Sequence, residues 1–290
     1  DKYGFRKGNN VISAQDQTMY ELAYEPIIAR RRGRWRKLIS TSHGNLPPRS
    51  KKLKRFVRKG IPPEFRGMCW LRYSGAEAKM LKNRGIYDDI VNRLEQRRVE
   101  TGQVSEAEEL IGRDLHRTFP HNSHFRLRLE ERRQALGGRQ HAQQHSVGSN
   151  TGILLAFVET RVEIGYHQAL SYIAALLLLF VDEEPAYWML LTIVDDILPP
   201  HYFDRRQEGS VVDQQIMFEL IRQRLPALWR HFNRDTPQSA LPNQSSSLIP
   251  QQLLISMAMS HWMPTLFVDV FPVETVLRIW DCLFCEVEST

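Results

Sequence analysis

Apolar residues recur at helical spacing along most of the chain, and alternating strand patterns are absent. One helix face is indicated by Ile153, Leu154, Phe157 and Val158. The same spacing continues through Ile216, Met217, Leu220, Ile221, Leu225, Leu228 and Phe232, where Pro226 predicts a kink. The longest apolar run, 169–181, has 13 residues, too few to span a bilayer, and predicts a buried helix. The pattern predicts an all-α protein without a transmembrane segment.

Capping and loop signals divide this helical pattern. Ser105 and Glu108 form a capping box for a helix that runs toward Arg117, and Pro120 stops it. Two polar stretches, 132–150 and 235–250, read as surface loops because they are rich in Gln, Ser, Gly or Pro. They separate a helical half that ends near residue 131 from a second half that starts near residue 151.

Charge is concentrated in one segment. The chain of 290 residues has a net charge of +6, and residues 30–59 hold 13 Lys or Arg and no acid. The rest of the sequence carries 26 basic and 33 acidic residues. The basic segment is either a patch for anionic lipid or nucleic acid, or a solvated and partly flexible arm. The arm is favoured because Pro47 and Pro48 interrupt the segment and only Trp35 and Phe56 are aromatic.

Cysteine usage indicates a reduced, cytosolic protein. Cys69, Cys282 and Cys285 are too few to crosslink a chain of 290 residues. The last two form a C-x-x-C within VLRIWDCLFC, where plain helix packing is favoured over a redox or zinc site.

Other signals of catalysis are weak. Nucleotide-binding glycine loops, H-E-x-x-H and G-x-S-x-G are all missing. His141 and His145 have no third ligand nearby, so no metal is expected. The adjacent pairs Asp88–Asp89 and Asp195–Asp196 are expected to be solvated helix faces, because neighbouring side chains point about 100° apart on a helix.

Two short stretches stand out. In IGRDLHRTFP, Asp114 and Arg117 are three residues apart, so the carboxylate can hold the guanidinium at the end of a helix. Such an arginine can enter a partner, or it can form an ordinary surface ion pair. In IGYHQ, Gln168 precedes the apolar run, where it can cap the helix or point outward and orient a water.

Together these stretches resemble the TBC domain, the fold of Rab GTPase-activating proteins. IGRDLHR matches the family's I-x-x-D-x-x-R, and YHQ matches its Y-x-Q. GIPPEFRGMCW, at 60–70, is similar to G-I-P-x-x-x-R-x-x-x-W and is followed by the family's S-G-A at 74–76. VDQQIMFELIRQRLP and FVDVFPVETVLRIWDCLF are similar to its second half. The resemblance covers most of the chain from Lys51 onward.

The resemblance implies a two-lobed all-α TBC domain at 60–290, with lobes at about 60–160 and 161–290, after an N-terminal extension at 1–59 that includes the basic arm. It implies activation of GTP hydrolysis by a GTP-bound Rab-family GTPase, which itself carries GTP and Mg²⁺, so that no cofactor of the chain's own and no nucleic acid are expected. It implies a cytoplasmic protein, peripheral to intracellular membranes, with a weak anionic membrane contact through 30–59.

The implied roles fall on single residues. Arg117 corresponds to an arginine finger that neutralises charge on the transferred phosphoryl group. Gln168 corresponds to a glutamine finger that orients the attacking water. Asp114 and Arg66 would brace the site, and Tyr166 would position Gln168. Trp70, at another motif position, is expected to lie in the core.

The chain departs from the family pattern in three places. Gln168 is followed by Ala169 and Ser171 where the family has Gly and Asn, a change expected to displace the glutamine if that glycine serves a close approach or a positive φ. The Gln-rich stretch before Asn150 is longer than usual. The sequence ends at CEVEST where the family continues, so a truncated second lobe is expected. The alternative functions are an adaptor that binds GTP-loaded Rab without catalysis, and a protein whose basic arm binds lipid or nucleic acid.

Overall fold

A computed structural model describes residues 1–5, 13–42, 44–125, 149–204, 206–232, 256–257 and 259–286. Within these ranges the chain forms helices and turns and no strand, which confirms the all-α prediction. In chain order the helices are α1 (Ala14–Ser40), α2 (Lys51–Lys59), α3 (Pro63–Ser74), α4 (Ala76–Lys82), α5 (Ile86–Thr101), α6 (Glu106–Leu115), α8 (Ser149–Thr160), α9 (Gln168–Leu177), α10 (Glu183–Thr192), the π-helix η2 (Ile193–Ile197), α11 (Glu208–Arg224), α12 (Pro226–Phe232) and α14 (Val273–Glu286). His141, His145 and the expected loop at 235–250 lie outside the described residues, as does 132–148 of the other loop.

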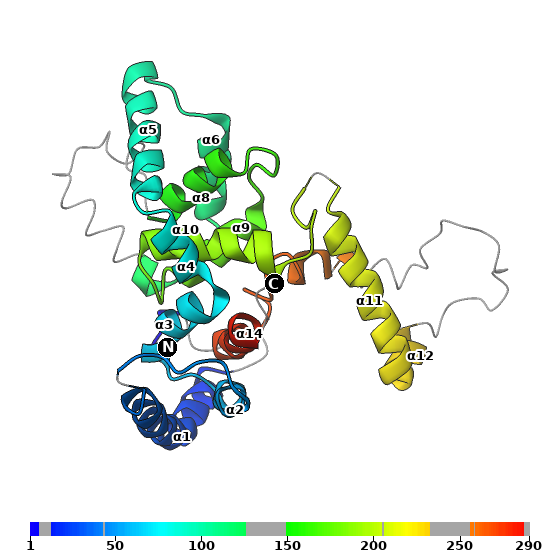
Figure 1. Cartoon of the computed structure of the whole chain (residues 1–290). Helices are drawn as coiled ribbons and strands as arrows, with labels where there is room; N and C mark the ends of the chain where they lie inside the picture. Colours follow the sequence, from blue (N-terminus) through cyan, green and yellow to red (C-terminus); the bar gives the residue numbers. More distant parts are fainter. Residues whose placement is uncertain are drawn as a thin grey trace, which may run out of the picture.

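Helices α8, α9 and α10 form the centre of the molecule, with α4, α5 and α6 packed around them (Figure 1). The apolar run predicted to be buried forms α9, and every residue from Ala169 to Leu177 is buried. Helix α6 starts at the predicted cap, where the Ser105 hydroxyl accepts the Glu108 backbone N–H at 3.2 Å. Helix α6 packs against both α8 and α9, so the end of α6 lies near the start of α9.

The basic segment is folded onto this body and is not a flexible arm. It forms the second half of α1 and all of α2, which packs against α14. Its apolar side chains enter the main core: Trp35 is 1% exposed, and Leu53 and Val57 are buried beside it. The indole of Trp35 donates to the Gly60 carbonyl at 3.2 Å, which joins α1 to the turn after α2. The prediction of a flexible arm is wrong because apolar residues spaced between the charges, among them Trp35, Leu53 and Val57, pack into the core.

Helices α11 and α12 extend away from the central helices (Figure 1). Pro226 was predicted to kink one long helix, but instead it begins a new one. Leu225 before it leaves the helical conformation (φ −129°, ψ 58°), and a helix rarely continues through such a residue. Among the described residues, Ile216 and Leu220 on α11 are about half exposed. The helices described include none long and apolar enough to cross a membrane.

Candidate functional site

Arg117 lies in the turn just after α6, which ends at Leu115. Its backbone N–H donates to the Asp114 carbonyl at 3.1 Å, so the chain is still coiled where the side chain leaves it. The guanidinium binds one oxygen of Asp114, Oδ1, through Nε at 2.9 Å and also through Nη2. The side chain of Arg117 is 61% exposed, whereas that of Asp114 is 9% exposed. A buried carboxylate therefore fixes an arginine whose charge reaches solvent.

Tyr166 holds the other oxygen of the same carboxylate. Its hydroxyl donates to Asp114 Oδ2 at 2.8 Å. Burial, and then the hydrogen bond to Asp114, raise the pKa of the Tyr166 phenol, so that it stays a donor at neutral pH. The structure thus brings together Tyr166, Asp114 and Arg117, three of the residues singled out from the sequence. Tyr166 contacts the carboxylate, not the side chain of Gln168 that it was expected to position.

Gln168 is the first residue of α9 and is partly exposed. Within the described chain its side chain has no hydrogen bond, and its backbone carbonyl accepts from the Ser171 hydroxyl at 2.8 Å. Ala169 is 3% exposed, lies in regular helix, and is not among the described residues with positive φ. A glycine is therefore not needed here for its backbone conformation.

Ser171 joins the two segments that carry Arg117 and Gln168. Its side chain is fully buried, and its Oγ lies 2.9 Å from Oγ1 of Thr118, the residue after Arg117. The Thr118 hydroxyl also lies 2.9 Å from the Asp114 carbonyl, which competes for its one proton. Because Ser171 gives its own proton to the Gln168 carbonyl, Thr118 is the donor in its contact with Ser171, and a chain of two hydroxyls then links both segments. The sequence marked Ser171 only as a departure from the family pattern, and no spacing along the chain predicts a contact to Thr118.

His167 caps the helix that begins at Gln168. Its Nδ1 accepts the Ala169 backbone N–H at 3.2 Å, which assigns the ring proton to Nε2. The Gln207 amide lies 2.9 Å from Nε2, and its oxygen is the atom able to accept that proton. Burial lowers the pKa of His167, against the opposing charge of Asp114, so the ring is neutral at pH 7. This cap was not predicted from the sequence.

Arg66 does not brace these residues directly, contrary to expectation. It is fully buried and contacts α14, donating to Glu274 Oε1 at 2.8 Å and to Asp281 Oδ1 at 3.2 Å. Asp281 also accepts the indole N–H of Trp70, a core residue as predicted, at 3.0 Å. Burial alone would lower the pKa of Arg66, but the negative charges of Asp281 and Glu274 outweigh it and keep the guanidinium protonated. Arg66 is thus the centre of a buried ionic network between α3 and α14.

The other sequence candidates show no catalytic arrangement among the described residues. Cys69 and Cys285 are buried free thiols, Cys282 is half-buried, and the described part of the chain contains no cluster of three metal ligands. Asp195 and Asp196 are exposed, as expected for a solvated face, and form surface ion pairs there: Asp195 binds Arg161 at 2.5 Å and Asp196 binds Lys79 at 2.6 Å.

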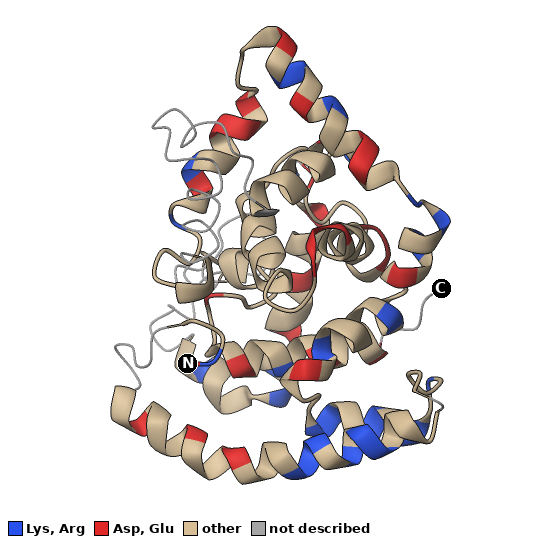
Figure 2. Cartoon of the chain, turned by 90° about the vertical axis from the view of Figure 1, so that its left-hand side faces the viewer, with Lys and Arg blue, Asp and Glu red and all other residues tan. Residues whose placement is uncertain are grey.

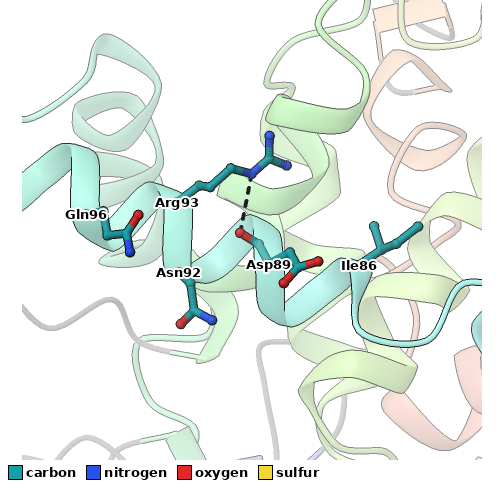
Figure 3. A pocket seen from close by; sticks show the side chains of 5 residues that line it. All are labelled: Ile86, Asp89, Asn92, Arg93 and Gln96. Atoms are coloured by element: carbon teal, nitrogen blue, oxygen red, sulfur yellow. Dashed lines mark hydrogen bonds between the residues drawn. The ribbon is translucent and has the colours of Figure 1, made fainter.

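A hollow on α5 is lined by none of the candidate residues (Figure 3). It is lined by Ile86, Asp89, Asn92, Arg93 and Gln96, all from that one helix. Arg93 Nε donates to the Asp89 backbone carbonyl at 3.3 Å across it. Since a single helix face cannot enclose a small molecule, this hollow has no features of a substrate pocket.

Comparisons with known proteins agree with the motifs. The model of the Rab-GTPase-TBC domain family matches residues 63–290. The chain is similar to "GTPase-activating protein GYP3" of Saccharomyces cerevisiae, with 32% identity over 99% of this chain and 47% of the yeast protein. It is 34% identical to "Growth hormone-regulated TBC protein 1-A" of Danio rerio, over 99% of this chain and 69% of the fish protein.

A solved structure agrees as well. The crystal structure of the Chlamydomonas flagellar RabGAP TBC domain superposes with a TM-score of 0.72 at 26% identity, covering 99% of this chain and 81% of that one. The chain spans 47% and 58% of the length of two yeast relatives.

Proposed function

The chain belongs to the Rab-GTPase-TBC domain family, and on that premise we propose that it stimulates GTP hydrolysis by a Rab-family small GTPase. The observation that carries the proposal is the exposed guanidinium of Arg117, held by the buried Asp114 beside the start of the helix that carries Gln168. Phosphoryl transfer needs positioning and charge stabilisation more than covalent chemistry, and both can be supplied by a partner protein.

Arg117 acts in this proposal as an arginine finger. Nε and Nη2 are used by Asp114, which leaves Nη1 without a hydrogen bond among the described residues. That edge of the guanidinium can donate to oxygens of the γ-phosphoryl group as negative charge develops on them. Asp114 and Tyr166 are positioning residues, because they fix the guanidinium before the partner arrives.

Gln168 acts as the second finger and orients the attacking water. Its amide offers both a donor and an acceptor, as a water placed in line with the γ-phosphate requires. GTP and Mg²⁺ are bound by the partner in its GTP-bound state, and the chain contributes no cofactor. The activity is therefore that of an enzyme activator which supplies two side chains in trans.

The alternative is an adaptor that binds GTP-loaded Rab without accelerating hydrolysis. The observation that favours it is the side chain of Gln168, which no hydrogen bond within the described chain restrains. If the partner does not order this amide, the water is left unplaced and only binding remains. The two functions differ in one measurement, the hydrolysis rate of the bound complex.

The proposal includes a weak contact with anionic membranes. The ribbon positions of Lys and Arg gather in the same part of the molecule, on α2 and the second half of α1 (Figure 2). Arg34, Arg36, Lys51 and Lys52 are exposed and form no ion pair with a described residue. Such a surface attracts anionic headgroups and would hold the protein at the cytoplasmic face of a membrane that carries its partner. Sparse stacking aromatics argue against nucleic acid as the ligand.

The test is single-turnover GTP hydrolysis across a panel of Rab proteins, with wild type, Arg117→Ala and Gln168→Ala measured side by side. We expect acceleration of a few Rabs, abolished by either substitution. Binding to each Rab loaded with a non-hydrolysable GTP analogue is measured in parallel. Binding without acceleration would replace the activator with the adaptor, and neither binding nor acceleration on any Rab would overturn both.

A further inference from the structure

Residues 1–5 (DKYGF), here called the N-terminal clip, lie between two parts of the fold that are far apart in sequence. One is the Arg66 network on α3 and α14, and the other is the loop 117–125 that follows α6. The clip is held in its own shape by Asp1, whose Oδ1 accepts the backbone N–H groups of Tyr3 at 2.9 Å and Phe5 at 3.0 Å.

Tyr3 anchors the clip in the core. Its side chain is 7% exposed, and its hydroxyl donates to Glu274 Oε2 at 2.7 Å while accepting from Arg66 Nη1 at 2.7 Å. Its ring contacts Phe180, with 5.7 Å between the centroids. Arg66 lies on α3, Glu274 lies on α14, and the two side chains form an ion pair. Because both partners of the Tyr3 hydroxyl are fixed in this way, this end of the clip is rigid.

The other end of the clip holds the loop that carries Arg117. The Asn122 side-chain amide donates to the Tyr3 carbonyl at 3.0 Å, and the Ser123 backbone N–H donates to the Gly4 carbonyl at 2.9 Å. The ring of Phe5 meets that of Phe119 edge to face at 5.0 Å. Backbone and side-chain contacts therefore converge on the residues just after Arg117.

Gly4 shows how closely the two segments approach. It has φ +84°, and a Cβ atom at this position would lie 2.5 Å from His124 Cδ2 and 2.6 Å from Asn122 Oδ1. Both the backbone conformation and the contact require glycine here.

Phe119, two residues after Arg117, has an unfavourable backbone conformation. Its φ is +52°, in the left-handed region that residues with a Cβ rarely adopt. Its ring is surrounded by Phe5, Phe125 and Tyr172 at centroid distances of 5.0, 6.0 and 5.6 Å. A strained residue persists only where its surroundings determine its conformation, and Phe5 supplies one of the three aromatic walls.

We propose that the N-terminal clip is a positioning element for Arg117: Phe5 and Tyr3 hold the loop 117–125 so that the guanidinium is preset for the partner's γ-phosphate. This inference rests on the proposed function. It also gives Arg66 an indirect role, because Arg66 binds the Tyr3 hydroxyl and so supports the clip from within the core.

The test compares Phe5→Ala with a matched control, Phe56→Ala. Phe56 is also a partly buried phenylalanine, but its ring meets Trp35 at 5.9 Å on the α1–α2 side. We expect Phe5→Ala to lower the maximal single-turnover rate about tenfold, since small displacements of a catalytic group have large effects on rate. The concentration for half-maximal stimulation should stay within about twofold, because the binding surface is kept. Phe56→Ala should change neither value.

A second arm separates positioning from general destabilisation. In an Asp114→Asn background, where Arg117 is already released, Phe5→Ala should cause less than its tenfold loss, whereas in a His167→Asn background, which alters the Gln168 side, the tenfold loss should persist. Melting temperatures are measured for each variant, and Phe5→Leu, which removes the ring but keeps an apolar side chain, replaces Phe5→Ala if the latter is unfolded at the assay temperature.

Three outcomes decide between the proposals. Equal losses for Phe5→Ala and Phe56→Ala, or an unchanged rate for Phe5→Ala in an active protein, would overturn the clip's role and leave the proposed function standing. A wild-type protein that stimulates no Rab would overturn the proposed function and this inference with it.

Discussion

The segments that carry Arg117 and Gln168 lie side by side but are restrained in different ways. Arg117 is fixed at its tip, because Asp114 binds its guanidinium and Tyr166 binds Asp114 in turn. Gln168 is fixed only through its backbone, by the His167 cap and the Ser171 hydroxyl. One segment presents an ordered charge and the other presents a free amide on an ordered helix.

The difference follows from the conformational entropy that each side chain loses when it binds the partner. A long arginine loses about 2 kcal/mol of side-chain entropy when it is ordered, and the ion pair of Arg117 with the buried Asp114 offsets that cost during folding. A glutamine amide that must follow a water cannot be fixed without its partner. We therefore expect the arginine side of the site to be sensitive to changes in this chain alone, and the glutamine side to depend more on the partner.

Arg117→Lys gives the largest expected effect. Lysine keeps the charge but lacks the planar fork that binds Asp114 with one edge and leaves another edge free. We expect a loss of about 10³-fold in stimulated hydrolysis, close to that of Arg117→Ala. Single-turnover rates on a responsive Rab measure it, with binding to the GTP-analogue complex as the control. A lysine variant that retains a tenth of the activity would show that charge alone suffices.

Asp114→Asn comes next, because it keeps the shape of the residue and removes the charge that holds Arg117. Hydrogen bonds to charged groups contribute about 1.5–3 kcal/mol, so we expect a loss of about 10- to 100-fold in the maximal rate. Asp195→Asn is the matched control, since Asp195 on η2 forms a similar two-pronged ion pair with Arg161, away from Arg117. Equal effects of the two substitutions would contradict a positioning role for Asp114.

Residues near one another in sequence account for most of what could be predicted. The apolar run was enough to predict the buried helix α9, and the three-residue step from Asp114 to Arg117 was enough to predict their ion pair. The contacts that depend on the tertiary fold could not be predicted in this way: Arg66 binds Asp281 from 215 positions away, and Asn122 binds Tyr3 across 119. The motif position of Arg66 predicted a place in the site, but its partners Glu274 and Asp281 lie more than 200 positions away and could not be predicted from it.

Ser171→Ala tests one of two hydrogen-bonded side-chain links described between the two segments; the other is the hydrogen bond from Tyr166 to Asp114. It removes the hydroxyl that contacts both Thr118 and the Gln168 carbonyl. Loss of a buried hydrogen bond of about 1 kcal/mol predicts a decrease of about fivefold in the maximal rate. Ser74→Ala is the control, because Ser74 is a similarly buried serine that also makes two hydrogen bonds, donating to the Leu71 carbonyl and accepting the Ala76 backbone N–H, neither of them to the two segments. If the Ser171 variant kept the full rate, the Ser171 hydroxyl would not be needed to position the two segments, and the bond from Tyr166 to Asp114 would be their remaining link.

The smallest expected effect is a pH dependence confined to the Gln168 side. Burial places the folded pKa of His167 below that of the unfolded chain, so acidification through the ordinary histidine range of about 6.5 adds protons mainly to the unfolded state and lowers stability. Protonation of Nδ1 would also remove the acceptor that caps α9; the charge of Asp114 favours this protonation, but burial outweighs it and keeps the pKa of His167 lowered. In His167→Asn the cap is an amide that does not titrate in this range.

We expect the ratio of the wild-type rate to the His167→Asn rate to be constant above pH 7 and to fall a few-fold toward pH 5.5, as loss of a cap worth about 1 kcal/mol predicts. Dividing each rate by that of the Rab alone at the same pH removes the partner's own titration. Because Arg117 is held by groups that do not involve this cap, the ratio should behave identically in a Phe5→Ala background, which retains a measurable rate. Parallel pH profiles for the two proteins would show that the cap does not control Gln168, and would leave Ser171 as its main restraint.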